Sequence, residues 1–157
     1  MAILEKVVTV PMDGDDKGKV FVITRMNAFA ADKWGRHVMQ AAISSGADLA
    51  GLNADDGLAG VAAAGINIFG IMDPTKTDVL LDQLMKCITV QPDPNNAAIR
   101  RPLHETDIVE IETVGWLQKE AFSLHVGFFK GVSRLFSLLY LMLGTPDQSA
   151  QSPEPRT

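Results

Sequence analysis

The acidic run Asp13-Gly14-Asp15-Asp16-Lys17-Gly18 has the residue types of a calcium-binding loop. An EF-hand loop needs an oxygen ligand at its fifth position and a glutamate at its twelfth. Counted from Asp13, those positions hold Lys17 and Thr24, so the calcium pattern is not met. The residues on either side have the composition of strands. We therefore interpret the run as the acidic turn of a β-hairpin.

The glycine-rich stretch from Gly57 to Gly70 is the next candidate, because glycine loops can cradle phosphates. A phosphate loop requires Gly-Lys-Ser or Gly-Lys-Thr, and a dinucleotide fingerprint requires a preceding apolar strand. The stretch has no such lysine, and Asp55-Asp56 precedes it with negative charge that repels phosphate. The glycines are better interpreted as small residues that allow helices to pack closely.

Three histidines, His37, His104 and His125, are the candidate metal ligands. Zinc sites usually take two ligands from nearby positions, such as histidines four residues apart on a helix. No two of these histidines are that close, and His104 and Glu105 could join His125 only through the fold. We interpret His125 as a hydrogen-bonded histidine of the core or its edge, and we expect no metal.

The other reactive groups do not form a catalytic arrangement. Cys87 is the only cysteine, has no base nearby in the sequence and falls on an amphipathic helix, which indicates a buried structural thiol. The acids from Glu105 to Glu112 could in principle do acid–base work, but acids suit the dipole at a helix start. No Gly-x-Ser-x-Gly turn is present. The sequence therefore predicts neither an enzyme nor a cofactor.

Length and charge restrict the class of protein. A chain of 157 residues with 46% hydrophobic and 21% charged residues is expected to form one globular domain, or one domain with a small appendage, with a hydrophobic core. The net charge of −5 and the scattered lysines and arginines argue against nucleic-acid binding. No signal peptide is visible, and the apolar stretches 57–72 and 128–143 are too short or too charged to span a membrane. We expect an intracellular binding protein.

The elements that would position these residues begin with an N-terminal β-hairpin over residues 1–26. Residues 3–10 are apolar and β-branched, and residues 19–25 alternate, with Val20 and Val22 on one face. A second short hairpin near 88–102 forms if Ile99–Arg101 pairs back against Thr89-Val90. Residues 27–143 make a helical body, and the polar, proline-containing residues 144–157 a disordered tail. The predicted fold class is α+β, mostly α-helical.

Four to five helices are predicted in the body. Asn27 is a good N-cap for the first, and three glycines argue against a long straight helix from Gly57 to Ile71. The strongest helical period runs from Asp107 to Val126, Gly127 allows a break, and Val132–Leu143 is the last helix. The apolar positions expected on the inner faces are Ala30, Trp34, His37, Val38 and Ala41 in the first helix, Leu80, Leu84, Cys87 and Ile88 in the helix from Thr75, and Val114, Leu117, Ala121, Leu124 and Phe128 in the helix from Asp107.

The last predicted helix carries the candidate binding site. It is apolar nearly all round, and such a helix must be buried on several sides. It is either a central core helix or a surface that docks against another subunit or an apolar helical client. The candidate partner-binding residues are Phe128, Phe129, Val132, Leu135, Phe136, Leu138, Leu139, Tyr140 and Met142.

Three stretches carry a resemblance to a known family. They are Lys19–Met26 followed by Ala31–Trp34, then Leu80–Ile88, then Arg101–Leu103 through Asp107–Glu110 to Leu117–Phe129. In these segments the chain resembles the tail assembly chaperones of long-tailed bacteriophages and related prophages. The stretches cover most of residues 19–129, and they are patterns of composition without a chemical motif. Gly115 departs from the pattern, because it either lies inside the predicted helix or marks the true start of that helix. The last apolar helix and the tail lie outside the match.

The resemblance implies a function in the cytoplasm of a bacterial host. Such proteins bind the tape measure protein, a long apolar helical polypeptide, and keep it soluble while the tail tube polymerises around it. They then leave and are absent from the virion. The major tail protein and a second copy of the chain are further partners to consider. The alternatives are a structural tail or head-completion protein of the virion, and a small metal-binding protein or enzyme.

Overall fold

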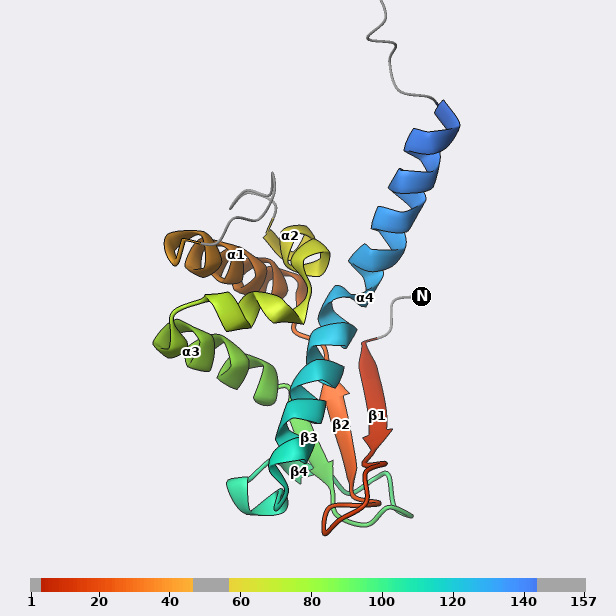
Figure 1. Ribbon diagram of the computed structural model, residues 1–157. Helices are drawn as coiled ribbons and strands as arrows, with labels where there is room; N and C mark the ends of the chain where they lie inside the picture. Colours follow the sequence, from red (N-terminus) through yellow and green to blue (C-terminus); the bar gives the residue numbers. More distant parts are fainter. Residues whose placement is uncertain (1–3, 47–56, 144–157) are drawn as a thin grey trace, which may run out of the picture.

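A computed structural model describes residues 4–46 and 57–143, and for 57–59, 63 and 128–143 it describes the backbone alone. The predicted disordered tail, 144–157, lies outside the described residues. A four-stranded antiparallel sheet packs against a larger set of helices, with α4 lying across one face of the sheet (Figure 1). The predicted α+β, mostly helical class is confirmed.

The sheet joins the two predicted hairpins. β1 (Glu5–Thr9) and β2 (Val20–Thr24) form the first hairpin, and β3 (Ile88–Gln91) and β4 (Arg101–Pro102) form the second. Because β3 pairs with β2, the strand order is β1-β2-β3-β4. The partner of β3 lies slightly later than the predicted Ile99–Arg101. Proline fits there because β4 is an edge strand with only one side in the ladder.

The central strand β2 is buried on both faces. Its first four residues, Val20 to Ile23, are all buried, and Phe21 and Ile23 belong to the main core. The core face continues through Val8 and Val10 of the first strand and its turn. On β1 the alternate residue Val7 is 54% exposed. The core of the molecule therefore lies between one face of this sheet and the helices.

α1 (Ala28–Ser44) begins at the predicted cap, because the Asn27 side chain accepts a hydrogen bond from the Ala30 N–H at 2.9 Å. It ends before Gly46, whose φ of +86° is the left-handed conformation that glycine adopts readily at a helix end. The predicted inner face was partly wrong, because Ala30 and His37 are exposed. The buried arc is rotated toward small residues where α1 contacts α2. Its members are Ala31, Trp34, Gly35, Val38, Met39, Ala41 and Ala42.

The glycine-rich stretch is broken as predicted. α2 (Gly57–Ala64) is followed by the 3-10 helix η2 (Ile66–Ile71), and Gly65 between them has a φ of +76°. α3 (Pro74–Met85) starts at Asp73, whose side chain accepts hydrogen bonds from the N–H groups of Thr75 and Lys76. Proline at the first position of α3 loses nothing, since that N–H has no helical partner anyway.

The last two predicted helices are one helix, which corrects the prediction of a break at Gly127. A short 3-10 turn, η3 (Glu105–Asp107), precedes α4 (Ile111–Leu143), which runs for 33 residues. The helix starts at Ile111, later than the predicted Asp107 and earlier than the alternative start at Gly115. Gly127 has no positive φ, and a single glycine in an otherwise helical sequence costs only about 1 kcal/mol. That cost is too small to end the helix.

Trp34 of α1 lies in the core, 2% exposed, where its ring faces η2 and α4. Its ring centroid is 6.2 Å from that of Phe69 and 6.4 Å from that of Phe122. Its Nε1–H donates to the Leu80 carbonyl at 3.1 Å, so the polar atom of a buried indole is satisfied and α1 is tied to α3.

In the described part of the chain, none of the helices combines the length and apolar content that crossing a membrane requires.

Candidate partner-binding surface

The predicted binding residues all fall on the C-terminal half of α4, and their side chains lie outside the described part of the structure. The backbone there is helical. Figure 1 shows this half of α4 continuing away from the sheet and from the other helices. The position of this C-terminal half is therefore set by the N-terminal half of α4 and by the residues that hold the N-terminal half in place.

The N-terminal half of α4 is packed into the core. Leu117, Ala121, Phe122 and Val126 are each no more than 2% exposed, at positions that return every turn. This half contacts α2, α3 and β2. Lys6 of β1 adds an ion pair to Glu120 at 2.6 Å, although half of the lysine is exposed and such a pair contributes little. The packed half is thus a fixed base for the rest of the helix.

A buried carboxylate holds the start of α4. Asp16, in the turn between β1 and β2, is 1% exposed and accepts hydrogen bonds from the N–H groups of Val109 and Glu110 at 3.1 and 2.8 Å. The Lys19 ammonium lies 2.7 Å from it. Burial alone would raise the pKa of this carboxyl, but the Lys19, backbone and Thr113 hydrogen bonds outweigh burial and hold the pKa well below its usual range. The acidic turn is therefore an anchor for α4.

The predicted acidic cluster is also structural. The Asp107 carboxylate pairs with both terminal nitrogens of Arg101 on β4, one of them at 2.7 Å, and accepts the His104 N–H at 2.7 Å. The Arg101 hydrogen bond, opposed by burial and assisted by the backbone, lowers the pKa of Asp107 to about 2. This pair fastens η3 to the edge of the sheet. It leaves Asp107 ionised and engaged at neutral pH.

His125 holds the far end of the packed half. It is 1% exposed, its Nε2 accepts the Met26 N–H at 3.0 Å, and its Nδ1 lies 2.7 Å from the Ala121 carbonyl. These partners require a neutral ring with the proton on Nδ1. Burial, opposed by the Ala121 bond and assisted by the charge of Arg25, lowers the pKa of His125. The prediction of a hydrogen-bonded core histidine is confirmed.

The remaining candidates stay apart. Cys87 is half-buried, its Sγ–H donates to the Gln83 carbonyl at 3.4 Å, and burial raises its pKa, so the thiol form prevails. His37 is exposed on α1 and His104 precedes η3. Within residues 4–46 and 57–143, no three histidine, cysteine or acidic side chains gather as metal ligands would.

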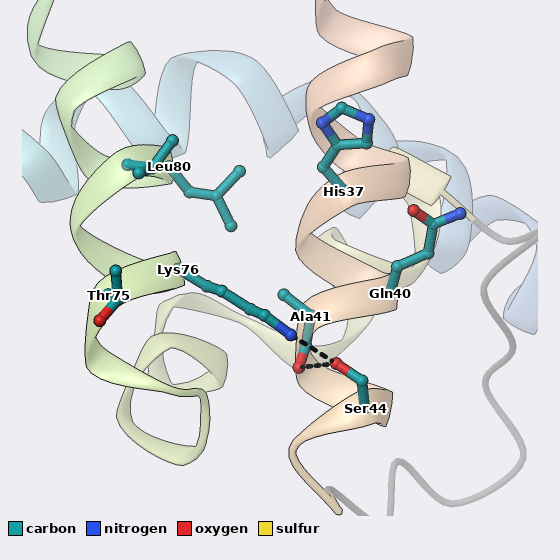
Figure 2. A pocket seen from close by; sticks show the side chains of 8 residues that line it. His37, Gln40, Ala41, Ser44, Thr75, Lys76 and Leu80 are labelled. Atoms are coloured by element: carbon teal, nitrogen blue, oxygen red, sulfur yellow. Dashed lines mark hydrogen bonds between the residues drawn. The ribbon is translucent and has the colours of Figure 1, made fainter.

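One surface was not predicted from the sequence. A groove of about 450 Å³ lies between α1 and α3, with Ala41, Val79 and Leu80 among its lining (Figure 2). The Lys76 side chain reaches across it from α3 and donates to the Ser44 hydroxyl of α1 at 3.1 Å. The available signal was that Lys33, His37, Gln40 and Ser44 recur at helical spacing beside the buried arc. Sequence alone does not show which helix packs beside that stripe.

Comparison of the chain with family models, curated proteins and solved structures finds no match.

Proposed function

We propose that the chain is a tail assembly chaperone, which binds the apolar helical tape measure protein through the C-terminal half of α4 and keeps it soluble while a tail tube assembles. One observation carries the proposal. A single helix runs from Ile111 to Leu143, with its first half in the core and its second half continuing away from the body (Figure 1). The resemblance noted in residues 19–129 points to the same function.

The extended half has the sequence of a docking helix. At 100° per residue, one stripe collects apolar side chains, and the opposite side carries Lys130 and Arg134. Such a stripe can lie along the apolar face of a client helix, as in other helix-to-helix recognition. The members of the stripe are Val132, Leu135, Phe136, Leu139 and Leu143.

Anchoring makes this arrangement effective for binding. The hydrogen bonds of Asp16 and His125 hold the two ends of the packed half, so the direction in which α4 leaves the body is set before a client arrives. Binding to a preformed helix avoids most of the entropy cost of ordering it. A net charge of −5 would add repulsion between coated clients and keep the complex dispersed.

We propose binding and not catalysis because the perturbed ionisable groups are already engaged. Asp16 and Asp107 accept backbone hydrogen bonds and ion pairs, and both nitrogens of His125 contact the backbone. Each of these groups holds α4 or η3 in place. A general acid or base would need a free lone pair or proton that faces a substrate.

The test is co-expression with the tape measure protein encoded in the same gene neighbourhood, followed by affinity capture. We expect the client to be soluble only with this chain and to co-purify with several copies of it. Leu135→Ser/Phe136→Ser should abolish capture with unchanged thermal unfolding. Leu141→Ser, on the opposite side of the same helix half, is the matched control and should retain capture. A client that stays insoluble, with this chain present in purified particles, would favour a structural virion protein instead.

A further inference from the structure

A shallow valley, lined by lysines, runs along the surface between α1 and α3. Two hollows open along it, of about 450 and 300 Å³, and His37 lines both. The first is the groove of Figure 2, and the second continues it toward the start of α1. Three lysines line the two hollows: Lys76 in the first, and Lys33 and Lys86 in the second. All three are exposed.

No residue lining either hollow is acidic, on a chain whose net charge is −5. Asp32 of α1 and Asp78 and Asp82 of α3 are not among the lining residues of either hollow. Asp32 pairs with Arg36 at 3.2 Å, and Asp82 lines a neighbouring hollow, which Lys86 also lines from its other side. Asp73, at the start of α3, is turned to the backbone N–H groups that it caps. The valley is therefore a local positive surface on an acidic protein.

The floor of the valley is apolar and firmly held. Val79, 56% exposed, lines the first hollow together with the nearly fully buried Leu80, and the nearly fully buried Trp34 lines the second. The Trp34 hydrogen bond to the Leu80 carbonyl ties the two walls together. Lys76 contacts a neutral hydroxyl, that of Ser44, and the part of the chain that the structure describes places no carboxylate within ion-pair distance of it.

We propose that this valley binds an acidic amphipathic helix of a partner protein, whose apolar face rests on Val79 and whose carboxylates pair with Lys33, Lys76 and Lys86. Two packed helices present a groove that a third helix can fill by ridge-into-groove packing. From Lys33 to Ser44 the α1 wall is about 16 Å long, which matches about three turns of a bound helix. The inference is independent of the proposed chaperone function, because it requires nothing of residues 128–143.

The probe is a fluorescent 15-residue helical peptide with leucines on one face and glutamates flanking them. Its counterpart has lysine in place of every glutamate and the same leucines. Anisotropy with the full chain should show binding of the acidic peptide alone. The Kd should rise several-fold between 50 and 300 mM salt, because exposed charge pairs are screened. Equal binding of the two peptides would show an apolar contact only and overturn the proposal.

Variants locate the site. Lys33→Glu/Lys76→Glu should weaken the acidic peptide more than tenfold, and Val79→Asp should weaken it without altering thermal unfolding. Lys17→Glu/Lys119→Glu produces the same net charge on other surfaces and should bind as the wild type does. Equal loss in both double variants would mean that net charge alone drives binding. A dimer in light scattering that Lys33→Glu/Lys76→Glu dissociates would mean that a second copy fills the valley, which also overturns the proposal.

Discussion

Two buried polar side chains decide how α4 leaves the body. Asp16 accepts the N–H groups of Val109 and Glu110 just before the helix, and His125 joins the end of its packed half to Met26 after β2. Both side chains are 1% exposed, and an unsatisfied partner at either place would cost about 1–3 kcal/mol. These two residues thus transmit the position of the sheet to the extended half of the helix.

The neutral, buried ring of His125 predicts that the protein loses stability in mild acid. Its pKa in the folded state lies below the ordinary value of 6.5. As the pH falls through 6.5, this histidine is therefore protonated in the unfolded chain before it is protonated in the folded chain. The free energy of unfolding should be level above pH 6.5 and fall as the pH drops below it. Urea unfolding at pH 7.5, 6.5 and 5.5 measures this slope, in a window above the titration of most carboxylates.

The matched variants are His125→Gln and His37→Gln. The first should lower stability at pH 7.5 by about 1–3 kcal/mol through its disturbed hydrogen bonds, and it should flatten the slope between pH 6.5 and 5.5. The second changes an exposed residue of α1 and should keep the wild-type slope. A slope that survives in His125→Gln would show that some other group causes it.

At the scale of single residues, the sequence predicted the burial of some polar side chains and missed that of others. The hydrogen-bonded core position of His125 followed from its place on an apolar helix face. The burial of Asp16 did not, because an acidic turn is normally solvated and the N–H groups that its carboxylate accepts lie more than 90 residues away. His37 was placed on the inner face of α1 by period alone, yet it is exposed, since the neighbours of α1 set which arc is buried.

At the scale of elements, Gly127 marks the passage of α4 from its packed to its extended half. It is exposed, and a methyl group added there would meet open space. Gly127→Ala should therefore stabilise the helix by up to about 1 kcal/mol, because alanine loses less backbone freedom than glycine. Hydrogen exchange should slow at the amides of residues 128–143, where opening of the helix end is local.

Gly115→Ala is the control for this change. Gly115 also faces open space on α4, but it lies in the packed half. That substitution should raise global stability and leave the exchange of residues 128–143 unchanged. Unaltered exchange in Gly127→Ala would show that the helix does not open at Gly127. Loss of client capture in Gly127→Ala but not in Gly115→Ala would show that binding needs a bend at residue 127.

Elements were predictable where the local signal was strong. The Asn27 cap, the lack of a long straight helix from Gly57 to Ile71 and the two hairpins follow from side-chain caps, glycine and β-branched residues. The continuity of α4 was missed because a glycine is a weak helix breaker, and helical residues on both sides outweigh it. The joining of the hairpins into one sheet was also beyond local reasoning, since β2 and β3 are separated by the whole of α1 to α3.

At the scale of the whole molecule, the residues of the core are different from those of the two proposed binding surfaces. The described core closes with Val126, and the packed aromatic rings of Trp34, Phe69 and Phe122 all lie before that residue. Beyond it, α4 continues away from the sheet and from the other described helices (Figure 1). The positive valley lies on α1 and α3. A partner could thus engage the extended helix, the valley or both without disturbing the core.

This separation predicts that a chain ending at Gly127 still folds. The deletion removes residues 128–157, all of them after Val126, the last residue of the described core, so the free energy of unfolding should change by less than about 1 kcal/mol, whereas loss of a core helix would cost several times more. Urea unfolding measures this free energy. Client binding is measured by capture of the co-expressed client, which should be lost. A chain ending at Leu143 is the control and should retain both properties. Unfolding of the shorter chain would place residues 128–143 in the core and remove the structural basis for docking through α4, whereas a folded shorter chain that still captures the client would place the client on another surface.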